Sequence, residues 1–142
     1  LLLGDVAAAH AHFEASYAIR KAHATEDPRN VTRQRDLAFS HYRLGTTWTR
    51  LGKAPEAMPQ LHAAMAIFQR LSQSDPGNAR WQVDVYNAHW RLADAGDEPR
   101  RRFDTIVRGL RRMRDENRLL PEHLVRLKEA EERLSKLVST GQ

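Results

Sequence analysis

Apolar residues recur along much of the chain at intervals of three and four positions, which is the spacing of one face of an α-helix. One such run extends from Leu37 to Leu51, and the next from Ala57 to Leu71. The same spacing returns between Phe103 and Met113 and again between Leu120 and Leu137. No segment has the strict alternation that is typical of a half-buried strand. The pattern therefore predicts an all-α protein.

The prolines divide this pattern into helices. Five of the six fall between the apolar runs or at the first turn of the following run, where a missing N–H costs no helical hydrogen bond. Pro59 lies inside a run, and we expect a local distortion or a later start of that helix. Asn30 begins a glycosylation sequon, but its place just before a helical run is typical of a helix cap. The expected helices span residues 5–25, 30–51, 54–74, 79–96, 99–119 and 121–139.

The chain also repeats itself at an offset of 48 residues. Ala18-Ile19 returns as Ala66-Ile67, and Asp27-Pro28-Arg29-Asn30 returns as Asp75-Pro76-Gly77-Asn78. A third, weaker copy follows at an offset of 45, so the copies cover roughly residues 1–48, 49–96 and 97–140, the last one degenerate. A helix with one apolar stripe cannot bury it alone, and short connections make neighbouring helices antiparallel. We therefore expect one domain over residues 1–142, an α-solenoid of about three helical hairpins.

The spacing from Leu44 onward is similar to that of a known repeat family. Leu44-Gly45, Trp48, Gly52, Ala57, Leu61 and Ala64 resemble the tetratricopeptide repeat signature, in which small residues let paired helices approach closely. The copies are longer than the roughly 34 residues of that family, and the repeated Asp-Pro connections look like a long-repeat variety common in large bacterial proteins. The resemblance implies a right-handed superhelix that recognises a partner, or itself, beside an effector or signalling domain.

The first residues align with the end of a helix. Leu1-Leu2-Leu3-Gly4-Asp5 corresponds to Thr49-Arg50-Leu51-Gly52-Lys53, so the first repeat opens half finished. We expect the sequence to be a fragment of a longer protein, because terminal repeats normally carry a polar cap. Uncapped solenoid ends are apolar, and self-association through them is a further expectation.

Composition narrows the function classes. None of the 142 residues is a cysteine, which excludes disulfides, thiolate metal sites and cysteine nucleophiles and permits a reducing compartment. No stretch approaches the roughly 18 consecutive apolar residues of a membrane span, and we expect a cytoplasmic protein with no membrane partner. The net charge is +5, and eight arginines against three acids lie between Arg100 and Arg118.

The polar residues offer no enzyme site. No two of the seven histidines are four positions apart, the spacing at which a helix brings two imidazoles to one face. No Gly-rich phosphate loop or nucleophile elbow is present. His41 and His89 occupy equivalent repeat positions, as do Asp36 and Asp84, so we expect packing and hydrogen-bonding roles for them. The sequence predicts no catalytic residue, no metal and no cofactor.

The leading hypothesis is a protein-interaction scaffold. The family resemblance implies that the first helix of each hairpin lines a concave groove. Tyr42 and Trp90 are the expected anchors there, because aromatic residues dominate interface hot spots. The Lys and Asn set that clamps a partner's terminal carboxylate in some family members is absent, and Tyr42 and Thr46 stand in its place. The implied groove residues are Phe39, Tyr42, Thr46, Thr49, Arg50, Asn87, Trp90 and Asp94.

The basic segment suggests other partners. Its arginines are suited to an acidic protein surface or to the phosphates of a nucleic acid. Nucleic acid is disfavoured, because no aromatic residues are interleaved with the arginines to stack bases. The alternatives to the scaffold are therefore a nucleic-acid-associated regulator and a homo-oligomerisation module. The predicted basic patch comprises Arg101, Arg108, Arg111, Arg112 and Arg118.

Overall fold

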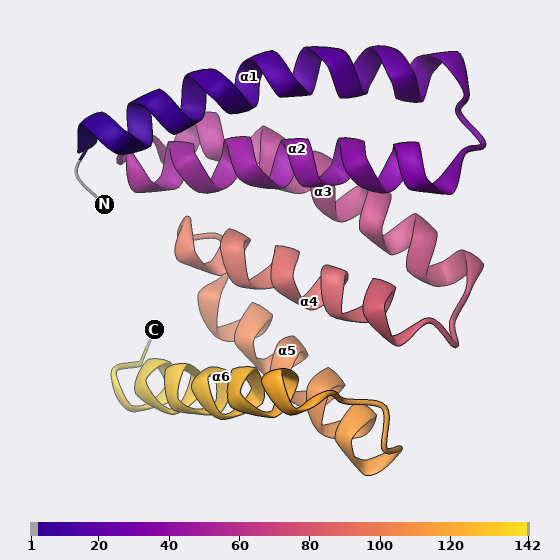
Figure 1. Ribbon diagram of the computed structural model, residues 1–142. Coiled ribbons are helices and arrows are strands. Elements are labelled where there is room, and N and C mark those ends of the chain that lie inside the picture. Colours follow the sequence, from indigo (N-terminus) through magenta and orange to yellow (C-terminus); the bar gives the residue numbers. More distant parts are fainter. Residues whose placement is uncertain (1–2, 142) are drawn as a thin grey trace.

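The computed structural model describes residues 3–141, and within that range the chain forms helices and short connections without a strand. Consecutive helices run in opposite directions (Figure 1). The prediction of an all-α protein with six helices is confirmed. They are α1 (Leu3–Glu26), α2 (Val31–Arg50), α3 (Ala54–Ser74), α4 (Ala79–Asp94), α5 (Pro99–Asp115) and α6 (Pro121–Ser139).

The connection that leads into α2 recurs before α4 with the same helix cap. Asn30 has an extended backbone, and its side-chain oxygen accepts a hydrogen bond from the N–H of Arg33 at 3.0 Å. Asn78 accepts one from the N–H of Trp81 at 3.1 Å. Each bond satisfies an N–H group that has no partner within its own helix. The capping interpretation of Asn30 is confirmed.

Each helix packs against its neighbours in the chain, and α2 also approaches α4. One apolar cluster lies between α2, α3 and α4 around Leu61, and a second lies between α4, α5 and α6 around Phe103. Helix α4 contributes to both, with Leu92 in the first cluster and Val83 in the second. The hairpins therefore stack through a shared helix, as the solenoid prediction requires.

Two of the helix contacts form at glycines. On α2, a Cβ at Gly45 would fall on the side chain of Leu61 from α3. On α5, a Cβ at Gly109 would fall on the ring of Tyr86 from α4. Because glycine has no side chain, the backbone at these two points can approach a large residue of the neighbouring helix.

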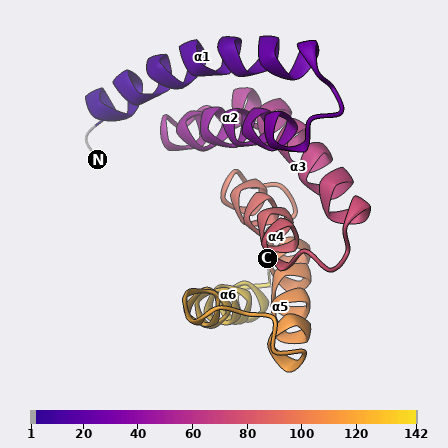
Figure 2. The ribbon, with the colours of Figure 1, turned by 45° about the vertical axis from the view of Figure 1, so that its right-hand side comes forward.

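Helices α2, α4 and α6 lie one after another on the near side of Figure 1, with α3 and α5 behind them. In Figure 2, turned by 45°, α5 and α6 both lie below α4, with α6 to the left of α5. All three near helices begin at the same side of the molecule, at the right of Figure 1. One face of the protein is thus lined by three parallel helices.

Some predicted boundaries are wrong. Helix α5 ends at Asp115 instead of residue 119, because Asn117 adopts a left-handed backbone (φ 56°) and turns the chain. Helix α1 already includes Leu3 to Asp5, so these residues do not repeat the turn at Gly52, while Leu1 and Leu2 lie outside the described residues. The predicted bounds 54–74 of α3 are confirmed, and Pro59 lies inside this helix, so the later start offered as one alternative does not occur.

Candidate functional site

A groove runs along α4 on the face that α2 and α6 also line. It consists of two adjoining hollows of about 500 and 210 Å³. The residues common to both hollows are Val83 and Asn87 of α4 with Glu122 and His123 of α6. We call the two hollows together the α4 groove. Its further lining residues are Arg35, Ala79, Arg80, Asp84, Tyr86, Trp90, Leu110, Arg118, Leu120 and Arg126.

An ion pair between α2 and α4 forms one wall of the α4 groove. Arg35 donates two hydrogen bonds to the carboxylate of Asp84, at 2.8 and 3.2 Å. Asp84 is only 5% exposed, and this burial raises the pKa of its carboxyl above the usual value, although Arg35 acts in the opposite direction. Asp84 therefore serves to hold α2 against α4. The inter-helix bond expected of Asp84 is present, whereas Asp36 is exposed and contributes only its backbone carbonyl, to Arg20.

Two arginines of the α4 groove lack an ion pair within the described residues. Arg126 of α6 lies over the Trp90 ring, with its guanidinium carbon 4.0 Å from the ring centroid. Partial burial lowers the pKa of the Arg126 guanidinium, which nevertheless stays a cation at any pH a protein meets. Arg80 of α4 is exposed. Within residues 3–141, neither side chain has a carboxylate within 4.0 Å.

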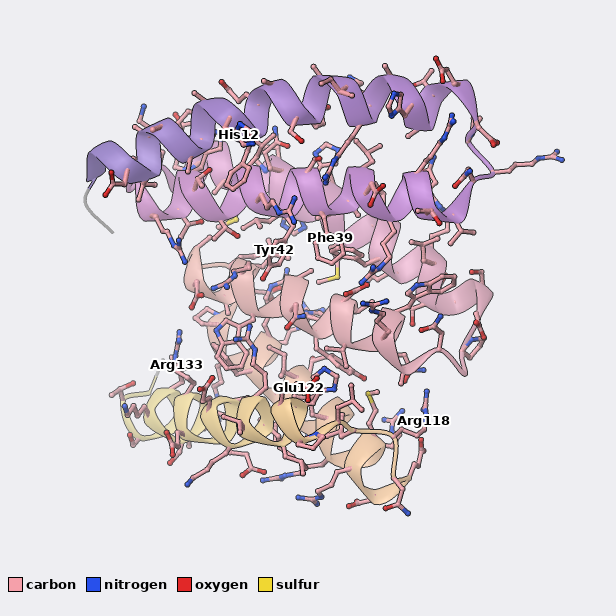
Figure 3. All side chains as sticks on the ribbon, in the orientation of Figure 1. His12, Phe39, Tyr42, Arg118, Glu122 and Arg133 are labelled. Carbon is pink, nitrogen blue, oxygen red and sulfur yellow. The ribbon has the colours of Figure 1, made fainter. Side chains whose placement is uncertain are left out.

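A network of side-chain hydrogen bonds joins α2, α4 and α6 near the C-terminal end of α4. Arg91 of α4 donates to the Tyr42 hydroxyl at 2.9 Å and to Asp94 at 3.3 Å. Arg133 of α6 donates to the other oxygen of Asp94 at 2.9 Å. Figure 3 shows Tyr42 between α2 and α4, and Arg133 projecting from α6 towards α4. Side-chain bonds thus join the three parallel helices beyond the end of the hollow.

The two expected aromatic anchors differ in their surroundings. Trp90 is only 6% exposed, with its ring centroid 5.0 Å from that of Phe103. It is covered by α5 and α6 and does not offer its ring to a partner. Tyr42 is half-buried, and its hydroxyl already accepts the bond from Arg91. Asn87, in contrast, is half-buried and lines both hollows.

The other predicted groove residues have local roles. Phe39 is partly buried, and its ring centroid lies 5.1 Å from that of Phe68 in α3. The hydroxyls of Thr46 and Thr49 donate to carbonyls one turn earlier in α2, at 2.8 and 2.9 Å. Arg50 is exposed at the end of α2. These four residues do not line the hollows on α4.

The predicted basic patch is largely paired with acids. Arg101 pairs with Glu98, Arg108 with Asp104 and Arg111 with Glu131, at 2.8, 2.9 and 2.9 Å. Arg118 pairs with Glu116 at 3.0 Å, lies beyond the end of α5 and lines the α4 groove. Arg112 faces a different hollow, of about 260 Å³, together with Tyr86. The five arginines therefore do not share one face.

The repeated histidines are hydrogen-bonded packing residues, as predicted. His41 bonds through Nδ1 to Gln60 of α3 at 2.7 Å. His89 accepts a bond from Arg102 at 3.0 Å through Nδ1. Burial, reinforced by Arg102, lowers the pKa of His89 from 6.5 to about 4, so the imidazole is neutral at pH 7. Within residues 3–141, no three histidine, aspartate or glutamate side chains gather closely enough to hold a metal ion.

Comparison of the chain with protein-family models, with curated proteins and with solved structures finds no match in any of the three. Among the helices of residues 3–141, none combines the length and apolar character of a membrane span. The site is therefore defined by its own geometry. Arg126, Glu122 and His123 come from the degenerate third copy, and at its offset of 45 they correspond to Trp81, Gly77 and Asn78, which differ from them in chemistry.

Proposed function

We propose that this chain is a protein-interaction module that holds a segment of a partner protein in the α4 groove. The observation that carries the proposal is the pair of adjoining hollows along α4, bordered by α6 and by Arg35 of α2 and lined mainly by polar side chains. Open grooves between the helices of stacked hairpins are the binding surfaces of repeat proteins. The sequence resemblance to tetratricopeptide repeats supports the same role and a bacterial, cytoplasmic setting.

The alternative of a nucleic-acid-binding regulator has less support. Four of the five predicted patch arginines are paired with carboxylates, and salt-bridged cations attract phosphates more weakly. Self-association remains a second candidate, because Ile19 on α1 and Val125 and Val138 on α6 are 59%, 61% and 50% exposed. Leu120 and Leu124 are also exposed beside Val125, but exposed apolar residues are common on protein surfaces, so we favour the groove.

Photo-crosslinking tests the proposal directly. The photoreactive amino acid p-benzoylphenylalanine replaces Asn87 in the groove or, as a matched control, the exposed Gln69 on α3. We expect the Asn87 probe to give discrete covalent adducts with one partner, identified by mass spectrometry, and the Gln69 probe to give none. Adducts of the same partner from Gln69 alone, or equal labelling at both positions, would place the interaction elsewhere.

A further inference from the structure

The charges that line the α4 groove do not balance. Four arginines face two carboxylates there, Asp84 and Glu122. Arg35 is held by Asp84, and Arg118 by Glu116. Arg80 and Arg126 have no such partner in the described part of the chain. Among the residues that line the groove, positive charge is therefore in excess, while Asp94 and Glu129 outside the lining act on Arg126 from a longer distance.

Arg126 is the better placed of the two unpaired cations. The Trp90 ring of α4, 4.0 Å from the guanidinium carbon, holds the guanidinium in place by a cation–π contact. No hydrogen bond from its five N–H groups to the described residues is formed, so its donors remain for a ligand. The Asn87 amide and the His123 imidazole line the same hollow and supply further hydrogen-bonding groups beside it. This arrangement matches a single carboxylate, which a guanidinium binds through two parallel hydrogen bonds.

The helix ends add to the positive potential. Helices α2, α4 and α6 begin at the same side of the molecule (Figure 1), and Ala79 and Leu120, at the starts of α4 and α6, line the larger hollow. The N-terminal end of a helix carries a partial positive charge. Figure 3 shows Glu122 at the start of α6, towards α4, so one acid interrupts this positive region. A ligand with separated negative charges fits better than one with a dense charge.

We propose that the α4 groove binds an extended acidic segment of a partner protein, with one carboxylate seated on Arg126 and a second near Arg80. This inference rests on the proposed function and names the chemistry of the partner. The stretch of α4 between positions 80 and 90 is about 15 Å long, the length of four to five extended residues. The two acidic residues of the segment are therefore about four positions apart. Nucleic acid fits less well, because Asp84 and Glu122 line the path and Trp90 is too buried to stack a base.

Fluorescence anisotropy with a labelled decapeptide of glutamate measures this interaction, with a lysine decapeptide as the control. We expect the whole chain to bind the glutamate peptide at low salt and not the lysine peptide. Arg126→Gln should weaken binding about tenfold. Arg126→Lys keeps the charge but loses the two parallel hydrogen bonds, so its affinity for the glutamate peptide should lie between those of the wild-type chain and Arg126→Gln. Arg108→Gln removes the same charge from α5, outside the α4 groove, and should change affinity less than about twofold.

Equal binding by the wild-type chain and Arg126→Gln, with circular dichroism showing both folded, would overturn the proposal, as would failure of the wild-type chain to bind the peptide. An equal loss in Arg108→Gln would show general charge attraction instead of a site. A twenty-nucleotide poly(dT) that binds more tightly than the peptide, and loses affinity in Arg126→Gln, would reassign the groove to nucleic acid. If the Asn87 crosslink persists undiminished in Arg126→Gln, the groove function stands while the acidic anchor fails.

Discussion

The contact between Gly45 and Leu61 offers a stringent test of the packing between α2 and α3. In Gly45→Ala, the new Cβ would overlap Cγ and Cδ2 of Leu61 and lie 3.3 Å from the carbonyl oxygen of Ala57. Leu61 is 0% exposed, so it has no free space into which to move. Alanine improves helix propensity by about 1 kcal/mol, while overpacking of a filled core costs about 1–3 kcal/mol. Because both side-chain carbons are blocked, we expect a net loss of about 1–2 kcal/mol.

A double-mutant cycle separates the two effects. Leu61→Ala removes the overlapping atoms, so Gly45→Ala in that background should stabilise the fold by about 1 kcal/mol, the propensity gain alone. Urea unfolding followed by circular dichroism at 222 nm measures all four variants. Gly109→Ala is the comparison, because the half-buried Tyr86 borders a hollow of about 260 Å³ into which its ring can turn, and its loss should be smaller. Packing at Gly45 would be refuted if the substitution had the same effect in both backgrounds.

Two further predictions concern buried charge. Arg35→Met leaves the Asp84 carboxylate unpaired, so the free energy of unfolding at pH 7 should fall by about 2–3 kcal/mol. Since protonated Asp84 needs no cation, this deficit should shrink as the pH falls through its raised pKa, and urea midpoints at pH 7 and pH 4 check it. The pKa of His89 is lowered from 6.5 to about 4, so its stabilising contribution is present above about pH 6.5 and is lost as the pH falls towards 4. This loss amounts to about 2 kcal/mol of unfolding free energy after allowance for partial solvation. In His89→Gln, the unfolding free energy should therefore depend less on pH over this range. An unchanged pH dependence in urea titrations would contradict the assignment.

The fold could be predicted from the sequence where local signals agreed. Apolar spacing, prolines at first turns and the two Asn caps act within a few residues of each other, so they can be read along the chain. The end of α5 was missed although a local signal existed. Asn117 is one of the few residue types that tolerate a left-handed backbone, and such a residue commonly ends a helix. Asn117 follows Asp115 and Glu116, so it is a local signal for the end of α5 at Asp115 and not at residue 119.

The candidate site was harder to predict because repeat equivalence describes position but not surroundings. Tyr42 and Trp90 are separated by the repeat offset, yet Tyr42 meets Arg91 of α4 whereas Trp90 meets Phe103 of α5. The covering residue Arg126 belongs to the degenerate copy, and its counterpart at the offset of 45 is Trp81, which gives no hint of an arginine. Contacts between residues this far apart in the sequence depend on how the hairpins stack, and neither spacing nor composition encodes them.

The arginines of this face fall into two kinds, and the difference bears on function. Arg35 and Arg91 each reach a carboxylate within the chain, so their desolvation is offset by helix-to-helix bonds. Arg126 is desolvated as well, but within residues 3–141 it forms no ion pair and packs against the Trp90 ring. Loss of a structural arginine exposes an unpaired acid and should destabilise the fold. Loss of Arg126 leaves no acid unpaired, because Asp94 keeps its bonds to Arg91 and Arg133, so its effect on stability should be smaller than that of Arg35. Arg126 therefore lies in the groove without being needed for folding, as expected of a residue that binds a partner.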